Sequence, residues 1–188
     1  MTQKSIFEPE GRAVPYLTEG EGPVALVLIT DRELEADGLG VVSHYLVEEA
    51  GFHVIRVGAR TGQDLTINER VDDALAVIDG LGLDAAWIGG HGLGGTVART
   101  FVTEHIDRAN GLLLLGVEDE QIPLAPAIPV LIVQATDDEV TPAANAEALQ
   151  ATAPERASIK TVEGAGHLFP ATHPIETAVI IEEYLDWD

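Results

Sequence analysis

The sequence predicts an α/β fold in which helices flank an open, doubly wound, mostly parallel sheet. Short, continuous apolar runs alternate along the chain with segments whose apolar residues recur at helical spacing. Such runs are typical of strands buried on both faces, and their alternation with helices is typical of parallel crossovers. The 188 residues, 46% of them hydrophobic, suffice for one core, so we expect residues 1–188 to form a single domain.

The first half of the chain supplies an edge strand and three buried strands. We expect them at residues 13–17, 24–29, 52–57 and 85–89. Gly51 can end a helix that an apolar stripe indicates at Val41, Val42, Tyr45 and Leu46. The next helix begins at a capping box, Thr66–Glu69, in which each terminal side chain bonds the other residue's backbone amide.

The second half continues the same alternation. Its predicted strands cover residues 111–116, 129–134 and 157–162. One helix follows the glycine-rich turn near residue 92, another begins at Thr141-Pro142, and the last covers Pro174–Leu185. The connection at 117–127 is too short to hold an inserted domain.

Composition restricts the location and the partners that we expect. The chain has no cysteine, no signal-peptide pattern and no apolar run that could span a bilayer, so we expect a cytoplasmic protein. Its net charge is −22, from 32 acidic and 10 basic residues. A field of that sign repels phosphates and anionic lipids, so we expect no nucleic acid and no membrane as partners. Solubility or a salty cytoplasm would each explain such an acidic surface.

The sheet is organised around Trp87–Thr96, where a strand pattern changes directly to a helical pattern. Gly90 and Gly94 occupy the flanking positions of the nucleophile elbow G-x-S-x-G, a strained turn that lifts a serine above the end of a strand. The central position is Gly92. The sequence therefore predicts the elbow without its nucleophile.

Two later motifs follow strands at the edge of the sheet where ligands of such folds bind. One is Thr136-Asp137-Asp138 and the other is Glu163-Gly164-Ala165-Gly166-His167. Together with the elbow, they resemble the α/β-hydrolase superfamily over nearly the whole chain, from about Gly22 to its end. The resemblance implies an α/β-hydrolase fold without a cap domain, in which Asp138 and His167 are catalytic and Gly92 is the vacant nucleophile position.

Two departures from that family argue against ordinary serine catalysis. Gly92 removes the nucleophile, a loss worth roughly a millionfold in rate. Thr30-Asp31 stands where the family commonly has His-Gly, and a carboxylate there opposes the negative charge of an acyl-transfer intermediate. Losing one oxyanion donor costs roughly 3 kcal/mol. No other serine is a credible substitute, since the remaining ones lie in the lead-in, a helix and a strand, at Ser5, Ser43 and Ser158.

Further residues extend the candidate site. Asp31 is a further catalytic candidate, and the ligand-binding candidates are Thr30, Arg32, His91 and Leu93. His91 also fits a packing role beneath the elbow. We expect no metal, because a site of His91, His167 and a carboxylate lacks a recognised ligand spacing.

The same turn also fits a dinucleotide fingerprint. Gly90–Gly95 reads G-x-G-x-x-G, and Glu118 follows the next strand. However, the turn lies in the middle of the chain, and acidic residues near it would repel a pyrophosphate. We therefore expect no cofactor.

Two functions remain open. The first is a non-catalytic pseudoenzyme, a binding or scaffold protein whose pocket holds a small neutral or cationic molecule; the double loss at the elbow and the oxyanion loop favours it. The second is a non-serine hydrolase or lyase in which His167 and Asp138, together with Asp31, activate water or abstract a proton. The histidine–aspartate pair would equally serve as a hydrogen-bonded staple between two loops.

Overall fold

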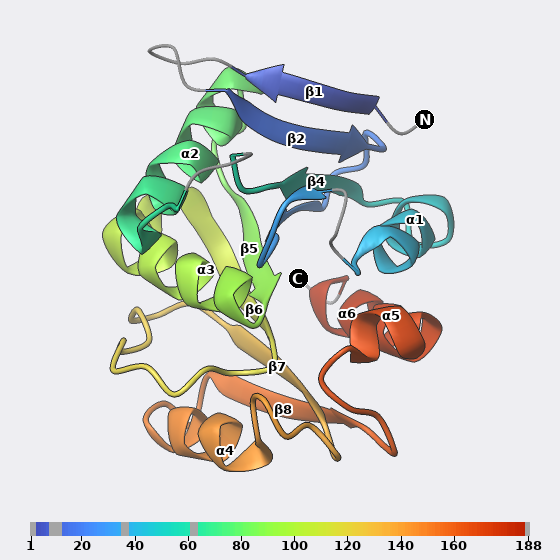
Figure 1. The fold of residues 1–188 in the computed structure, drawn as a ribbon, viewed down its shortest axis with the longest axis vertical. Helices are drawn as coiled ribbons and strands as arrows, with labels where there is room; N and C mark the ends of the chain where they lie inside the picture. Colours follow the sequence, from blue (N-terminus) through green and yellow to red (C-terminus); the bar gives the residue numbers. More distant parts are fainter. Residues whose placement is uncertain (1–2, 8–12, 35–37, 61–63, 187–188) are drawn as a thin grey trace.

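The computed structural model describes residues 3–7, 13–34, 38–60 and 64–186. Within these ranges eight strands form one sheet. They are β1 (Gln3–Phe7), β2 (Val14–Glu19), β3 (Ala25–Ile29), β4 (His53–Val57), β5 (Ala86–His91), β6 (Ala109–Leu115), β7 (Val130–Ala135) and β8 (Ala157–Val162). The strand order is β1-β2-β4-β3-β5-β6-β7-β8 (Figure 1). Strand β2 is antiparallel to both neighbours, and every other pair is parallel.

Helices cover both faces of the sheet (Figure 1). One face carries α2 (Ile67–Gly80), α3 (Leu93–Glu104) and α4 (Ala143–Ala151). The other carries α1 (Gly40–Glu48), α5 (Phe169–Thr172) and α6 (Pro174–Leu185). A 3₁₀ turn, η3 (Ile106–Arg108), leads from α3 into β6. None of the described helices is long and apolar enough to span a bilayer.

Two core clusters form because successive side chains of a strand point to opposite faces. In β3, Val27 and Ile29 enter the cluster under α2 and α3, whereas Leu26 and Leu28 enter the cluster under α1 and α6. All four are fully buried. The predicted doubly wound α/β sheet is thus confirmed, and the capping box of Thr66 and Glu69 at the start of α2 is present.

Two predictions about local structure are wrong. The segment expected at 13–17 as an edge strand corresponds to β2, which lies second, because β1 pairs along its outer side. Residues 3–7 have no clear apolar alternation, and backbone pairing does not depend on one. The stripe predicted for α1 fails at Val41, which is 55% exposed, because Val42 and Leu46 lie one turn apart and fill the core instead.

The crossover from β6 to β7 differs from the others. Helices α1, α2, α3 and α4 each connect two consecutive parallel strands, as such crossovers usually require. Residues 116–129, all of them described, instead run from β6 to β7 without a helix, a strand or an inserted domain. The fold therefore has no cap, and an irregular segment lies between α3 and α4 (Figure 1).

Candidate active site

The carboxyl end of β5 passes directly into α3 through Gly92. Its backbone angles, φ 57° and ψ −117°, lie in a region that glycine adopts with little strain. The flanking glycines are required by close contacts: a Cβ on Gly94 would lie 1.9 Å from the carbonyl oxygen of Ile29, and one on Gly90 would lie 2.3 Å from the carbonyl carbon of Gly94. The turn therefore has the geometry of an elbow, with the start of α3 pressed against the end of β3.

Space remains at the apex of this turn. A Cβ on Gly92 would have His167 as its nearest neighbour, at 3.6 Å from both Cε1 and Nε2. No backbone atom crowds that position, so a side chain would fit, although the positive φ would strain it. The fold thus brings Gly92 and His167, which are far apart in the sequence, into one site.

Asp138 lies in the turn after β7 and is held by four hydrogen bonds. Its Oδ1 accepts the backbone N–H groups of Val140 and Thr141 at 2.9 and 2.8 Å. Its Oδ2 accepts the Thr141 hydroxyl at 2.6 Å and Nδ1 of His167 at 3.1 Å. Burial alone would raise the pKa of Asp138, but the hydrogen bonds from Thr141, His167 and Val140 outweigh it and lower the pKa below its usual value. The carboxylate is therefore ionised and fixed in orientation.

His167 follows β8 and connects Asp138 to the elbow. Because Nδ1 donates to the carboxylate, the neutral ring presents an unprotonated Nε2 toward Gly92. About 20% of its side chain is exposed, so the ring can be reached from solvent. This is the orientation in which a histidine accepts a proton from a bound molecule.

His91 packs against His167 and bonds to its backbone. The two rings stack with centroids 4.5 Å apart, and Nε2 of His91 donates to the backbone carbonyl of His167 at 2.7 Å. Burial, followed by the nearby His167, lowers the pKa of His91, so its neutral form is favoured. Its ring is almost entirely buried, which suits the packing role more than direct contact with a ligand.

The loop after β3 places its three candidate residues differently. Thr30 is fully buried, and its hydroxyl donates to the carbonyls of Arg32 and Val57. Asp31 is partly exposed and lies 3.4 Å from the Nε of the exposed Arg32. The carboxylate of Asp31 also acts on His91, where it opposes the lowering of the pKa. Asp31 is therefore close enough to influence the site, whereas the Thr30 hydroxyl is engaged by backbone carbonyls of the loop and of β4.

Two features of the site were not predicted from the sequence. The sequence indicates Thr141 only as part of a helix start, yet its hydroxyl and its backbone amide both donate hydrogen bonds to Asp138. An aspartate followed three residues later by threonine is a recognisable turn pattern that could have revealed it. The second feature is that exposed apolar side chains follow further site residues in the chain, Leu168 directly after His167 and Val140 two residues after Asp138. With the predicted Leu93, which follows Gly92 and is also exposed, we call these side chains the apolar rim.

Other chemistries find no support in the described part of the chain. It contains no group of three or more histidine, cysteine or acidic residues that could hold a metal. The tight contact of Gly94 with Ile29 explains that glycine without a pyrophosphate. Glu118, the acidic residue of the dinucleotide fingerprint, accepts a hydrogen bond from Thr96.

Known proteins share this architecture. A sequence model described as "Alpha/beta hydrolase family" matches residues 26–170. A predicted CIB-like hydrolase from Thermoplasma acidophilum is 15% identical, with 98% of each chain covered and a TM-score of 0.81. A thermophilic esterase from Thermogutta terrifontis is 17% identical, with 98% of each chain covered and a TM-score of 0.80. A serine hydrolase from Cycloclasticus zankles is 12% identical, with 99% of this chain and 98% of that chain covered and a TM-score of 0.83.

Proposed function

The chain belongs to the alpha/beta hydrolase family, and we propose that it hydrolyses a small neutral or cationic ester by activating water directly, without an acyl-enzyme intermediate. The observation that carries this proposal is the pair of His167 and Asp138, formed at 3.1 Å and directed at the open position beside Gly92. A buried loop staple would not need Nε2 of His167 to face that position.

The proposed reaction follows from this geometry. A water molecule beside Gly92 gives a proton to Nε2 of His167, and its oxygen attacks the ester carbonyl carbon. Asp138 stabilises the imidazolium that forms. The tetrahedral intermediate then expels the alkoxide, which takes the proton back from Nε2, so that the products are an acid and an alcohol. The Leu93 amide is first in α3 and has no partner inside the helix, so it is a donor available for the developing oxyanion.

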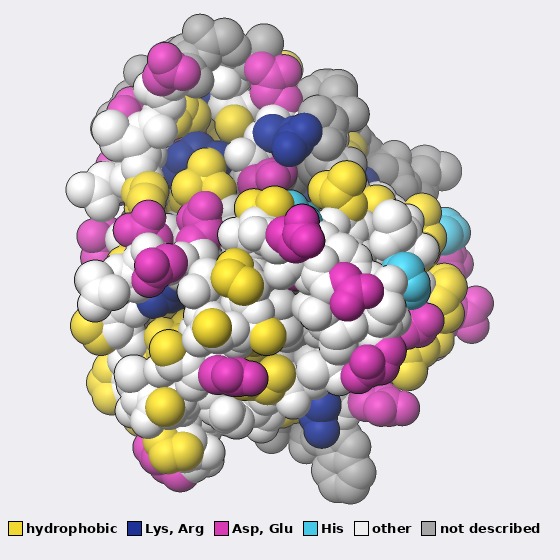
Figure 2. Space-filling view, turned by 60° about the horizontal axis from the view of Figure 1, so that its bottom comes forward, with side chains coloured by type: hydrophobic (Ala, Val, Ile, Leu, Met, Phe, Trp, Pro, Cys, Tyr) yellow, Lys and Arg dark blue, Asp and Glu magenta, His cyan; other side chains and the backbone are white. Residues whose placement is uncertain are grey.

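The surroundings of the site support a substrate that is apolar and not anionic. The apolar rim consists of Leu93, Val140 and Leu168, which are 40%, 68% and 59% exposed. Acidic side chains are spread over the face in Figure 2 and basic ones are few, in keeping with the net charge of −22. A field of this sign would repel an anionic ester and attract a cationic one.

A second candidate is the non-catalytic binding protein, and Asp31 favours it. Its carboxylate lies in the loop after β3, where the α/β-hydrolase family commonly has a His-Gly pair that supplies an oxyanion donor. The neighbouring elbow also lacks a nucleophile. A negative charge in that loop would slow any reaction that passes through an oxyanion. In this alternative the apolar rim and His167 bind a small neutral or cationic molecule, and no turnover occurs.

Hydrolysis of p-nitrophenyl butyrate, a neutral apolar ester, by the purified protein tests the proposal. We expect His167→Ala to lower the rate about 10²–10⁴-fold, because a general base contributes that much. His44→Ala is the matched control, since His44 is an exposed histidine on α1. We also expect no burst of nitrophenol and no acylated protein by intact mass.

Each outcome separates the candidates. Equal rates in the wild type and His167→Ala would rule out the general-base mechanism, and an acylated species in the wild type would rule out direct water attack. No hydrolysis of this ester or of the cationic ester butyrylcholine would leave the non-catalytic binding protein as the better conclusion.

A further inference from the structure

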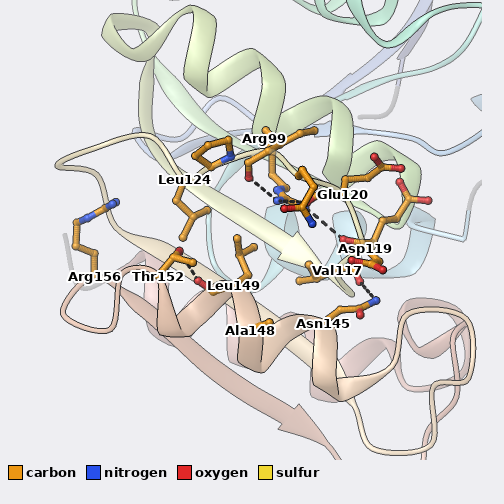
Figure 3. Close-up of a pocket in the computed structure, with 14 residues that line it drawn as sticks. Arg99, Val117, Asp119, Glu120, Leu124, Asn145, Ala148, Leu149, Thr152 and Arg156 are labelled. Atoms are coloured by element: carbon orange, nitrogen blue, oxygen red, sulfur yellow. Dashed lines mark hydrogen bonds between the residues drawn. The ribbon is translucent and has the colours of Figure 1, made fainter.

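A cavity of about 400 Å³ lies beneath the crossover that has no helix (Figure 3). Its walls are α3, α4 and the irregular segment 117–124, and none of its lining residues belongs to the candidate active site. Ligand pockets typically have volumes of about 300–1,000 Å³. The cavity is therefore large enough for a small organic molecule and is separate from His167.

Arginine side chains hold the segment over this cavity. The guanidinium of Arg99, on α3, donates to the carbonyls of Glu118, Glu120 and Ile122. Arg156 donates to the carbonyls of Ala125 and Ile128. These bonds replace those that a crossover helix would make within itself, so the segment is fixed without filling the space beneath it.

The lining combines three kinds of group. Apolar side chains of the segment and of α4 form the inner surface, among them Val117, Leu124, Ala148 and Leu149. Carboxylates occupy one end, where Figure 3 shows Asp119 and Glu120, whereas Arg156 lies at the other end. Arg99 is only 3% exposed, and its Nε has no hydrogen-bond partner among the described residues. A buried donor without an acceptor is costly, and an acceptor on a ligand would remove that cost.

We propose that this cavity binds a small organic cation that has an apolar body and a neutral acceptor oxygen. The ammonium group would lie among Glu118, Asp119 and Glu120, the body along Ala148 and Leu149, and the acceptor at Nε of Arg99. Arg99 and Arg156 donate hydrogen bonds from their guanidinium groups to backbone carbonyls of the irregular segment. The carboxylates of Asp119 and Glu120 therefore remain for the ligand, while one oxygen of Glu118 accepts the Thr96 hydroxyl. The negative field of the whole molecule also favours a cation.

Isothermal titration calorimetry with procainamide tests the proposal. This amide carries a tertiary ammonium, an aromatic ring and a carbonyl, and it is not an ester that the active site could consume. We expect a dissociation constant of about 0.1–1 mM, typical of a ligand of this size in a modest pocket. An isostere in which carbon replaces the amine nitrogen should bind about 2- to 5-fold more weakly, as for a partly exposed ion pair.

Variants locate the binding site. Ala148→Trp, at an exposed position of α4 that lines the cavity, should fill it and abolish binding. Glu120→Gln should weaken binding about 2- to 5-fold, and Glu147→Gln, the same charge change on an exposed residue outside the lining, should not. His167→Ala should leave binding unchanged.

The results decide the proposal in every case. It is overturned if procainamide does not bind, if the neutral isostere binds equally well, or if Ala148→Trp retains binding while its melting temperature matches the wild type. Loss of binding in His167→Ala would place the molecule at the active site instead. Because ester hydrolysis is not measured, failure of the proposed function would not affect this result.

Discussion

Gly92 occupies the position at which the elbow motif carries its nucleophilic serine. Its φ of 57° keeps the strained backbone of an elbow, while its missing side chain leaves Nε2 of His167 without a hydroxyl to deprotonate. A Cβ there would meet no atom nearer than 3.6 Å. Steric crowding therefore does not explain the glycine, whereas relief of backbone strain does.

Restoring a hydroxyl at this position should create a weak serine esterase. We expect Gly92→Ser to lose about 1–3 kcal/mol of unfolding free energy, because a side chain is strained at this φ. The variant should react with a fluorophosphonate probe and show a burst with p-nitrophenyl acetate, whereas the wild type should do neither. Gly92→Ala is the matched control, since it has the same strain and no hydroxyl.

The loop after β3 should limit that variant. Changing Thr30-Asp31 to His-Gly in the Gly92→Ser background should raise the burst rate, because the carboxylate of Asp31 no longer opposes the oxyanion. A fast esterase from Gly92→Ser alone would show that Asp31 is not a second defect. Absence of an acyl-enzyme in the triple variant would contradict the grouping of Gly92, Asp138 and His167 into one site.

His91 should make stability depend on pH. Its pKa is lowered in the folded protein, so the unfolded chain binds a proton first as the pH falls below its usual value of about 6.5. Its contribution to stability is therefore complete above that pH and is lost as the pH falls toward the folded pKa, by at most about 1.4 kcal/mol per pH unit. Urea unfolding at several pH values between 7.5 and 5 measures how steeply the unfolding free energy falls with pH. We expect this pH dependence to be weaker in His91→Gln than in the wild type. If the pH dependence of the unfolding free energy is the same in both proteins, it comes from other groups. One such group is His53, because burial also lowers its pKa.

Among the elements, α3 is placed by direct backbone contact with β3. A methyl group on Gly94 would lie 1.9 Å from the carbonyl oxygen of Ile29, closer than any packing allows. The start of α3 must therefore move away from the sheet if this residue gains a side chain. Since Gly92 immediately precedes α3, the elbow and the distance to His167 depend on that contact.

Gly94→Ala should accordingly be severely destabilising. We expect a loss of about 3 kcal/mol or more, at the upper end of overpacking costs, because backbone rather than a flexible side chain must move. Gly166→Ala is the matched control, since its Cβ would meet nothing nearer than the carbonyl oxygen of Asp137 at 3.9 Å. Chemical denaturation measures both, and a loss below about 1 kcal/mol for Gly94→Ala would show that α3 is not held in this way.

At the scale of the whole molecule, the net charge of −22 acts against the compact state. Like charges on a folded surface repel each other, and mobile ions screen that repulsion. Among the described residues the buried charges nearly cancel, because Arg56, Arg60, Arg70 and Arg99 lie inside the fold together with Glu19, Asp73 and Asp138. The exposed charge is therefore strongly acidic.

Salt should stabilise the protein. Raising NaCl from 10 mM to 1 M shortens the screening length from about 30 to 3 Å, and each kcal/mol of relieved repulsion should raise the melting temperature about 2–4 °C. Calorimetry at pH 7 measures the effect. The same salt series near the isoelectric point of about 4.3 should give a much smaller shift. A melting temperature that stays constant at pH 7 would show that surface repulsion is negligible.

The sequence by itself determined the architecture and most of the candidate site. The alternation of apolar runs and helical patterns predicts β3 to β8 and their crossovers, because burial on both faces of a parallel sheet imposes that pattern locally. The glycines of the elbow and the two late motifs indicate where Gly92, Asp138 and His167 lie. Strand β1 was not predicted, because an edge strand is held mainly by backbone hydrogen bonds. Such bonds do not require an alternation of apolar and polar residues in the sequence.

Only the tertiary structure decided how these residues act together. The bonds of Thr141 to Asp138, the stacking of His91 on His167 and the open position at Gly92 join segments that are far apart in the chain. The cavity beneath residues 117–124 also belongs to this level, since it exists because Arg99 and Arg156 hold a helix-free crossover between α3 and α4. Periodicity records which side chains are buried, but distances between side chains follow only from the packing of whole elements.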